Sequence, residues 1–171
     1  MKTKGDMLEG HTVQESDAQG IGLYYTANTT MQGNVMEGNA WNFVYYGDDP
    51  APGNSVDTSN TVDGRPIVYL EGVSGMTIDP SSNAGAVCCV GCDSMSIEGL
   101  ALQETGCGIS LLSTRESSIE GCAISNAYDG IHLSNVSGIA IEACSITASR
   151  VYECLSTFER SEGLQPRRQH P

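Results

Sequence analysis

A sequence repeat of about 22 residues occurs three times in succession in the second half of this chain. The clearest copy, at residues 117–136, reads "SSIEGCAISNAYDGIHLSNV". Apolar residues recur in register, in four columns: Ile97, Ile119 and Ile141; Leu100, Cys122 and Cys144; Leu102, Ile124 and Ile146; Leu111, Leu133 and Leu155. A fixed period in the twenties with aligned apolar positions is typical of a solenoid, in which each repeat covers the hydrophobic face of the next.

Within one repeat, apolar residues alternate with polar or small ones instead of following helical spacing. Leu100 and Leu102 show this period of two, as do Ile109 and Leu111, and the pattern favours strands. A Glu-Gly pair and a longer polar stretch interrupt this alternation, and we interpret both as turns between strands. Three short strands and three turns describe one coil of a parallel β-helix, whereas the Leu and Asn spacing of a leucine-rich repeat is missing. We therefore predict an all-β parallel β-helix with coils of about 22 residues.

The same pattern extends toward the N-terminus. Residues 20–36 overlay residues 108–124 at an offset of four periods, so we expect the β-helix over residues 20–160, in five or six coils. Residues 37–66 break the pattern with Pro, Gly and Asp, and we expect them to leave the solenoid as an inserted loop or hairpin. Residues 1–19 are expected to form an N-terminal cap or lead-in, and residues 161–171 a disordered tail.

Charge limits the partners of this chain. The formal net charge is −13 at pH 7, which disfavours nucleic acid and anionic membranes as partners, because both require cationic side chains. No apolar stretch reaches the length of a membrane span, so we expect no direct membrane insertion. The start of the chain lacks the apolar region of a signal peptide, and a repeat already begins near Gly20. The chain is therefore expected to be a fragment of a longer protein.

The seven cysteines leave at least one thiol unpaired within the chain. Cys89 and Cys92 have C-x-x-C spacing, but no second pair stands at zinc-finger spacing. Most of the thiols are expected to be small buried hydrophobes. Cys122 above Cys144 is the most natural candidate for a disulfide, and free packing thiols fit the same pattern equally well.

The repeat resembles a known family. "SSIEGCAISNAYDGIHL" is similar to the parallel β-helix repeat of NosD-like proteins, also called the carbohydrate-binding and sugar-hydrolase (CASH) domain. "GNSVDTSNTVDGRPIVYL" resembles a segment that precedes such repeats in surface proteins of methanogenic archaea. The resemblance implies a right-handed coil and an exported, often glycosylated protein that is extracellular or at the cell surface. The same repeat occurs in enzymes, binding proteins and envelope proteins, so it does not specify an activity. The copper delivery associated with NosD has no Met- or His-rich site here to support it.

One candidate site is a column of carboxylates that follow inward-facing isoleucines in successive coils: Asp79, Glu98, Glu120 and Glu142. Neighbouring coils stack about 4.8 Å apart, so these groups would repel one another or attract Ca²⁺. The alternative is that they splay into water at a corner of the coil.

A second candidate site combines aromatic and polar residues for substrate binding: Trp41, Tyr45, Tyr46, Asp129 and His132. Aromatic side chains in the segment 37–66 would stack on sugar rings or cover apolar surface of the solenoid, and Tyr24 and Tyr25 would extend the patch. Asp129 and His132 lie close together in one turn and the strand that follows it. This placement is compatible with acid/base chemistry and equally with an ordinary turn.

We expect a non-catalytic secreted or cell-surface module that binds carbohydrate or scaffolds the cell envelope, with no catalytic residue assigned. If the protein is exported, the sequons at Asn28 and Asn135 are glycosylation sites. One alternative is a polysaccharide lyase or glycoside hydrolase, although hydrolysis requires a carboxyl pair that the sequence does not identify. The other alternative is a sheath or surface-layer subunit that self-associates end to end through its open coils.

Overall fold

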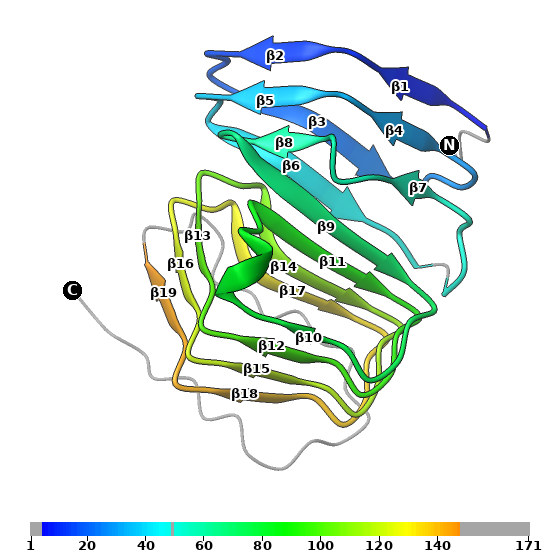
Figure 1. Ribbon diagram of the computed structural model, residues 1–171, viewed down its shortest axis with the longest axis vertical. Coiled ribbons are helices and arrows are strands. Elements are labelled where there is room, and N and C mark those ends of the chain that lie inside the picture. The colour runs from blue at the N-terminus through cyan, green and yellow to red at the C-terminus, as the bar shows by residue number, and fades with distance from the viewer. Residues whose placement is uncertain (1–4, 49, 148–171) are drawn as a thin grey trace.

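The computed structural model describes residues 5–48 and 50–147, which form a parallel β-helix of about six coils (Figure 1). Among these residues, every strand pairing is parallel except the pairing of β8 with β9. The predicted fold class is therefore confirmed. No helix in the described part of the chain has the length and apolar character that crossing a membrane requires.

The coils fall into two stacks. The N-terminal stack contains β1 (Met7–Glu9), β2 (Thr12–Gln14), β3 (Gln19–Tyr24), β4 (Thr30–Gln32), β5 (Val35–Glu37), β6 (Trp41–Tyr46), β7 (Ser55–Val56) and β8 (Thr61–Val62). Strands of successive coils pair as β1-β4-β7 on one side, β2-β5-β8 on the second side and β3-β6 on the third side.

The C-terminal stack contains β9 (Arg65–Glu71), β10 (Thr77–Ile78), the 3₁₀ turn η1 (Pro80–Ser82), β11 (Ala86–Val90), β12 (Ser96–Glu98), β13 (Ala101–Gln103), β14 (Cys107–Leu112), β15 (Ser118–Glu120), β16 (Ala123–Ser125), β17 (Asp129–Ser134), β18 (Ala140–Glu142) and β19 (Ser145–Thr147). Its three sides are β10-β12-β15-β18, β13-β16-β19 and β9-β11-β14-β17.

The pairing register follows the repeat in the sequence. Ile97 pairs with Ile119 and Ile119 with Ile141, each one coil apart. The columns that contain Leu102 and Leu111 pair in the same way. The predicted 22-residue register is thus confirmed for the described coils; Leu155 lies outside the described residues.

A tight hairpin joins the two stacks. Val62 of β8 pairs with Arg65 of β9 in antiparallel fashion, and the two residues between them, Asp63 and Gly64, both have positive φ angles (48° and 73°). Two positive φ angles in a two-residue loop favour a twisted hairpin, and Asp-Gly is a preferred sequence for it. The hairpin links one side of the N-terminal stack to one side of the C-terminal stack, which gives a single seven-stranded sheet, β2-β5-β8-β9-β11-β14-β17.

Residues 37–66, which the sequence led us to expect as an inserted excursion, supply β6, β7 and β8 to the N-terminal stack and then the hairpin. Residues 1–19 include β1 and β2, which belong to the first coil. Both segments keep to the β-helix because their short strands find parallel partners in the neighbouring coil. The expected tail, residues 161–171, lies outside the described residues.

The shared sheet has a hydrophobic core on each of its two faces. Cys89, Ile109 and Leu111 point into the core of the C-terminal stack. Their neighbours Cys88 and Leu112 point the other way, into a second core that the N-terminal stack completes with residues such as Met31, Phe43 and Tyr45. Every residue of β11 and β14 is consequently buried, which accounts for the continuous apolar run in β11, since strands covered on both faces do not alternate.

The corners between strands use different side chains in the two stacks. In the N-terminal stack, the Asn34 and Asn60 amides each donate to a backbone carbonyl of the preceding coil, at 2.8 Å. In the C-terminal stack, Cys122 and Cys144 occupy the corresponding corner, and their thiols contact carbonyls of the preceding coil at 3.8 and 3.7 Å. Both arrangements satisfy a buried carbonyl, as a buried polar group requires, and the thiol also adds apolar surface to the core.

Leu112 tests whether the N-terminal stack covers the outer face of the shared sheet. Replacing Leu112 by Ala should lower the free energy of unfolding by about 2–5 kcal/mol, because the side chain is fully buried in the second core. Ser134, which pairs with Leu112 one coil further on and is only half-buried, is the matched control, and Ser134→Ala should change stability by less than about 0.5 kcal/mol. Urea unfolding followed by circular dichroism measures both. Equal, small effects for the two variants would contradict the two-core arrangement.

Candidate functional site

A cleft forms where β6 of the N-terminal stack meets the C-terminal stack. Two backbone hydrogen bonds fix this junction: Asn42 N–H donates to Glu104 O at 3.0 Å, and Gly106 N–H donates to Phe43 O at 2.8 Å. A side chain at position 106 would collide with Val44, since a Cβ there would lie 2.1 Å from Val44 Cγ2. Glycine at this turn therefore lets β6 approach β14 closely enough to form one wall of the cleft.

The cleft contains an aromatic hollow of about 420 Å³, lined by Gln19, Tyr24, Trp41, Val44, Tyr46 and Tyr128. These residues come from β3, from β6 and from the turn that precedes β17, so segments far apart in the sequence build one surface. The volume is within the range of about 300–1,000 Å³ that small-molecule sites usually occupy. We refer to this feature below as the aromatic hollow.

Two pairs of rings shape the hollow. Trp41 and Tyr128 meet edge to face, with ring centroids 5.1 Å apart at an interplanar angle of 77°. Tyr24 and Tyr46 stack at 5.7 Å and 23°. Tyr24 and Tyr128 remain 41% and 38% exposed, so both offer aromatic surface to a ligand. Rings that already contact one another are held in place and lose little freedom on binding.

Polar side chains lie beneath Tyr46. The Tyr46 hydroxyl donates a hydrogen bond to Asp129 Oδ2, and Asp129 is only 6% exposed. Burial raises the pKa of Tyr46, and the nearby Cys107 thiol and Asp129 add to the effect, so the phenol keeps its proton and acts as the donor. Burial also raises the pKa of Cys107 to about 11. Cys107 is therefore a neutral thiol at neutral pH and not an activated nucleophile.

His132 completes this wall of the cleft. Its ring lies edge to face with Tyr46, with centroids 4.7 Å apart at 82°, and Ser110 is its neighbour on β14. Burial lowers the pKa of His132, while the neighbouring carboxylate of Asp129 acts in the opposite direction. The imidazole is therefore neutral at pH 7 and can accept as well as donate a hydrogen bond.

The structure brings together four of the five residues that the sequence suggested for substrate binding. Trp41 and Tyr46 line the hollow, and Asp129 and His132 contact Tyr46. Tyr45 lies elsewhere: it is 2% exposed and packs in the core between the stacks, because adjacent residues of a strand face opposite sides.

Sequence reasoning missed Gln19 and Tyr128 as lining residues. The one sequence signal for Tyr128 is that it directly precedes Asp129. Gln19 accepts a hydrogen bond from the Tyr24 hydroxyl, a contact with no counterpart in the repeat pattern. Tyr24, suggested as an extension of the aromatic patch, does line the hollow, whereas Tyr25 is exposed and is not one of the lining residues.

A second, shallower hollow of about 750 Å³ adjoins the first and is lined by Glu15, Ser16, Asp17, Gly38, Asn39, Ala40, Glu104 and Asn126. Ala40 directly precedes Trp41, and Asn126 lies two residues before Tyr128, so the two hollows follow the same junction between the stacks. The cleft thus has an aromatic end and an end rich in carboxylate and amide groups.

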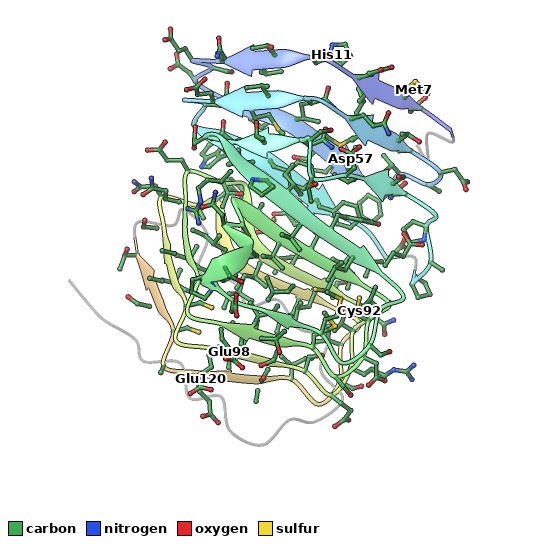
Figure 2. The ribbon with its side chains drawn as sticks, viewed as in Figure 1. Met7, His11, Asp57, Cys92, Glu98 and Glu120 are labelled. Atoms are coloured by element: carbon green, nitrogen blue, oxygen red, sulfur yellow. The ribbon has the colours of Figure 1, made fainter. Side chains whose placement is uncertain are left out.

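The carboxylate column is only partly formed. Glu98, Glu120 and Glu142 pair in register on β12, β15 and β18 and are exposed; Glu98 and Glu120 lie on neighbouring strands in Figure 2. Asp79 instead caps η1, where hydrogen bonds from the Ser81 hydroxyl and amide lower its pKa. Within the described residues, no group of three or more His, Cys, Asp or Glu side chains is arranged to hold a metal ion. Calcium binding along the column stays a prediction.

Both sequons lie on the surface. Asn28 and Asn135 are exposed and have positive φ angles of 56° and 53° at turns of the coil. The Asn135 amide donates to Ser113 Oγ at 3.0 Å. Glycosylation of the two residues stays a prediction.

Comparison with known protein families supports the predicted fold class, the parallel β-helix. The family model described as "Right handed beta helix region" matches residues 85–162, which include most of the described C-terminal stack. No curated protein and no solved structure matches the chain. Together with the strand pairing, the family match defines a right-handed parallel β-helix repeat protein.

His132 should make stability depend on pH. Its pKa is lowered in the folded state relative to an ordinary value of 6.5, so the unfolded chain binds a proton first as the pH falls. The free energy of unfolding should therefore be insensitive to this group above pH 6.5 and decrease as the pH falls through the folded pKa. Urea unfolding between neutral and mildly acidic pH should show this decrease, and His132→Gln should flatten it. An identical pH profile for the variant would contradict the assignment.

The carboxylate column predicts a response to cations. Calcium should raise the melting temperature by relieving repulsion among Glu98, Glu120 and Glu142, and Glu120→Gln should reduce the rise because it removes the central charge. Asp57→Asn, on an exposed carboxylate outside the column, is the control. Differential scanning calorimetry with and without calcium measures the effect. An unchanged wild-type melting temperature would contradict a calcium strip.

Proposed function

We propose that the protein binds a neutral polysaccharide in the aromatic hollow, as a non-catalytic module. The observation that carries the proposal is the convergence of four rings, those of Tyr24, Trp41, Tyr46 and Tyr128, on one hollow with Gln19 at its edge. The C–H faces of sugar rings pack on aromatic side chains, while a few placed polar groups bind the hydroxyls and give specificity.

The charges around the cleft favour a neutral ligand over a polyanion. Within residues 5–48 and 50–147, the cationic Lys and Arg side chains are Arg65 and Arg115, and neither lines the hollows. The Arg65 guanidinium is already engaged with Ala101 O at 2.7 Å. A polysaccharide rich in uronic acid or sulfate would therefore meet carboxylates of the adjoining hollow without compensating cations.

The rival function, polysaccharide cleavage, would use Asp129 and His132. Both lie under Tyr46, and the Asp129 carboxylate is already engaged by the Tyr46 hydroxyl. Hydrolysis by an acid and a base or nucleophile needs a second carboxyl group within about 5–9.5 Å, and none of the described lining residues of the aromatic hollow provides one. This difference favours binding over turnover.

We also propose a location outside the cell or at its surface, which the resemblance of the repeat to cell-surface proteins supports. Envelope scaffolding and end-to-end self-association stay predictions. The first coil supplies one feature in favour of association: its inward residues Leu8, Val13 and Ile21 are only partly buried by the described chain.

Mutation of the hollow tests the proposal. Trp41→Ala and Tyr128→Ala should each weaken binding of a neutral glucan or mannan about tenfold, or about 1.4 kcal/mol, as measured by isothermal titration calorimetry. Tyr25→Ala is the matched control, because Tyr25 is exposed yet outside the lining of the hollow, and it should bind as the wild type does.

Two outcomes would contradict the proposal. The first is binding of polygalacturonate in preference to neutral polymers. The second is release of reducing or unsaturated sugars during incubation, with loss of that activity in Asp129→Asn, which would establish the enzymatic alternative.

A further inference from the structure

A pair of cysteines lies at one corner of the C-terminal stack, away from the aromatic hollow. Cys89 ends the inward-facing row of β11, and Cys92 follows after Gly91, whose φ of 60° turns the chain. Both side chains lie in the core of the C-terminal stack, close enough for each to affect the ionisation of the other. Cys88 points to the opposite face of β11, so it does not compete for this contact. Figure 2 shows Cys92 where the strands of this stack end and the chain turns.

The surroundings make the two sulfurs chemically different. As a thiol, Cys92 contacts the carbonyls of Leu70 and Val90, each at 3.5 Å. The Cys89 thiol, together with backbone groups of Val73 and Gly72, lowers the pKa of Cys92 to about 6, whereas the same contact with Cys92 raises the pKa of Cys89. Cys92 is therefore the member of the pair that ionises more readily, and Cys89 is the protonated thiol within reach of it. A low-pKa cysteine beside a resolving cysteine is the arrangement that oxidants select.

The stacked pair Cys122 and Cys144 offers a contrast within the same protein. Both thiols donate to carbonyls of the preceding coil and of their own coil. Burial raises the pKa of Cys122, and the neighbouring Cys144 thiol raises it further, so the reactive thiolate form of Cys122 is disfavoured. Because the two residues occupy equivalent corners of successive parallel coils, their side chains point the same way, an unfavourable starting geometry for a disulfide.

We propose that Cys89 and Cys92 form an oxidisable dithiol, which small peroxides convert to an intramolecular disulfide. The Cys92 thiolate attacks one oxygen of hydrogen peroxide, an S–O bond forms, the O–O bond breaks and hydroxide leaves. The Cys89 sulfur then attacks the Cys92 sulfenic acid, the S–S bond forms, and the Cys89 proton leaves with the hydroxyl group as water. The hydroxide takes up the proton that Cys92 released, so two thiols and one peroxide give one disulfide and two waters.

Burial selects the size of the oxidant. Cys92 is 1% exposed and Cys89 is fully buried, so a bulky aromatic disulfide reagent cannot approach either sulfur in the folded protein. Hydrogen peroxide is small and neutral, and it needs only slight opening of the corner to reach Cys92. The site therefore takes small peroxides and not large disulfides.

The test is mass spectrometry of the full chain after treatment with hydrogen peroxide under native conditions, followed by alkylation of the remaining thiols in denaturant. The wild type should lose about 2 Da before alkylation and accept two fewer alkyl groups. Cys89→Ser should instead stop at a sulfenic acid on Cys92, which dimedone traps once the oxidised protein is transferred to denaturant. The double variant Cys122→Ser/Cys144→Ser is the matched control and should form the disulfide as the wild type does.

Cys92→Thr separates a chemical role from a structural one. Thr114 occupies the equivalent corner one coil further on, where its hydroxyl donates to Cys89 O and Leu112 O at 3.1 and 3.2 Å. Threonine at position 92 should therefore keep the corner and the wild-type circular dichroism spectrum while abolishing both the disulfide and the dimedone adduct. Disulfide formation in Cys92→Thr, or loss of it in the Cys122/Cys144 double variant, would overturn the proposal.

Discussion

The outer face of the sheet β9-β11-β14 has to be covered, and the rest of the architecture follows from how the chain covers it. In an isolated β-helix this face would be exposed to water, yet here it carries Cys88, Val90 and Leu112, which are buried against Met31, Phe43 and Tyr45 of the N-terminal stack. Burial of apolar surface contributes about 25 cal/mol per Å², so two stacks that share one apolar sheet stabilise each other. The Asp63-Gly64 hairpin makes this possible, because it turns the chain from one stack directly into the sheet that both stacks use.

Satisfaction of buried polar groups imposes a second constraint, and the two stacks meet it with different chemistry. Asparagine amides at the corners of the N-terminal stack bind backbone carbonyls of the preceding coil. Thiols and hydroxyls do so in the C-terminal stack, at Cys122, Cys144 and Thr114. Among the described cysteines, Cys92, Cys122 and Cys144 lie at corners, whereas Cys88, Cys89 and Cys107 lie in strands. Cys92 at such a corner lies beside Cys89 of β11 within one coil, and this is the pair for which we propose oxidation.

The proposed binding site is a consequence of the junction between the stacks. Because β6 crosses beside β14 and β17, Tyr46 lies over Asp129 and His132, and Trp41 meets Tyr128. Local pattern was enough to suggest Trp41, Tyr46, Asp129 and His132 as candidate binding residues, but not that Tyr46 buries Asp129. It was not enough to separate Tyr45 from Tyr46, since neighbours on a strand face opposite sides and the sequence does not say which side is covered.

The sequence by itself determined the coil: the 22-residue register, the alternation that marks strands and the glycine and polar turns are local properties, and the pairing follows them residue by residue. The continuous apolar run of β11 matches the burial of this strand on both faces. Only the tertiary structure decided what lies against the second face, because a repeat pattern encodes contacts between adjacent coils and not the angle at which one stack meets another. That angle arises from a two-residue hairpin, and it places β6, the aromatic hollow and the core between the stacks.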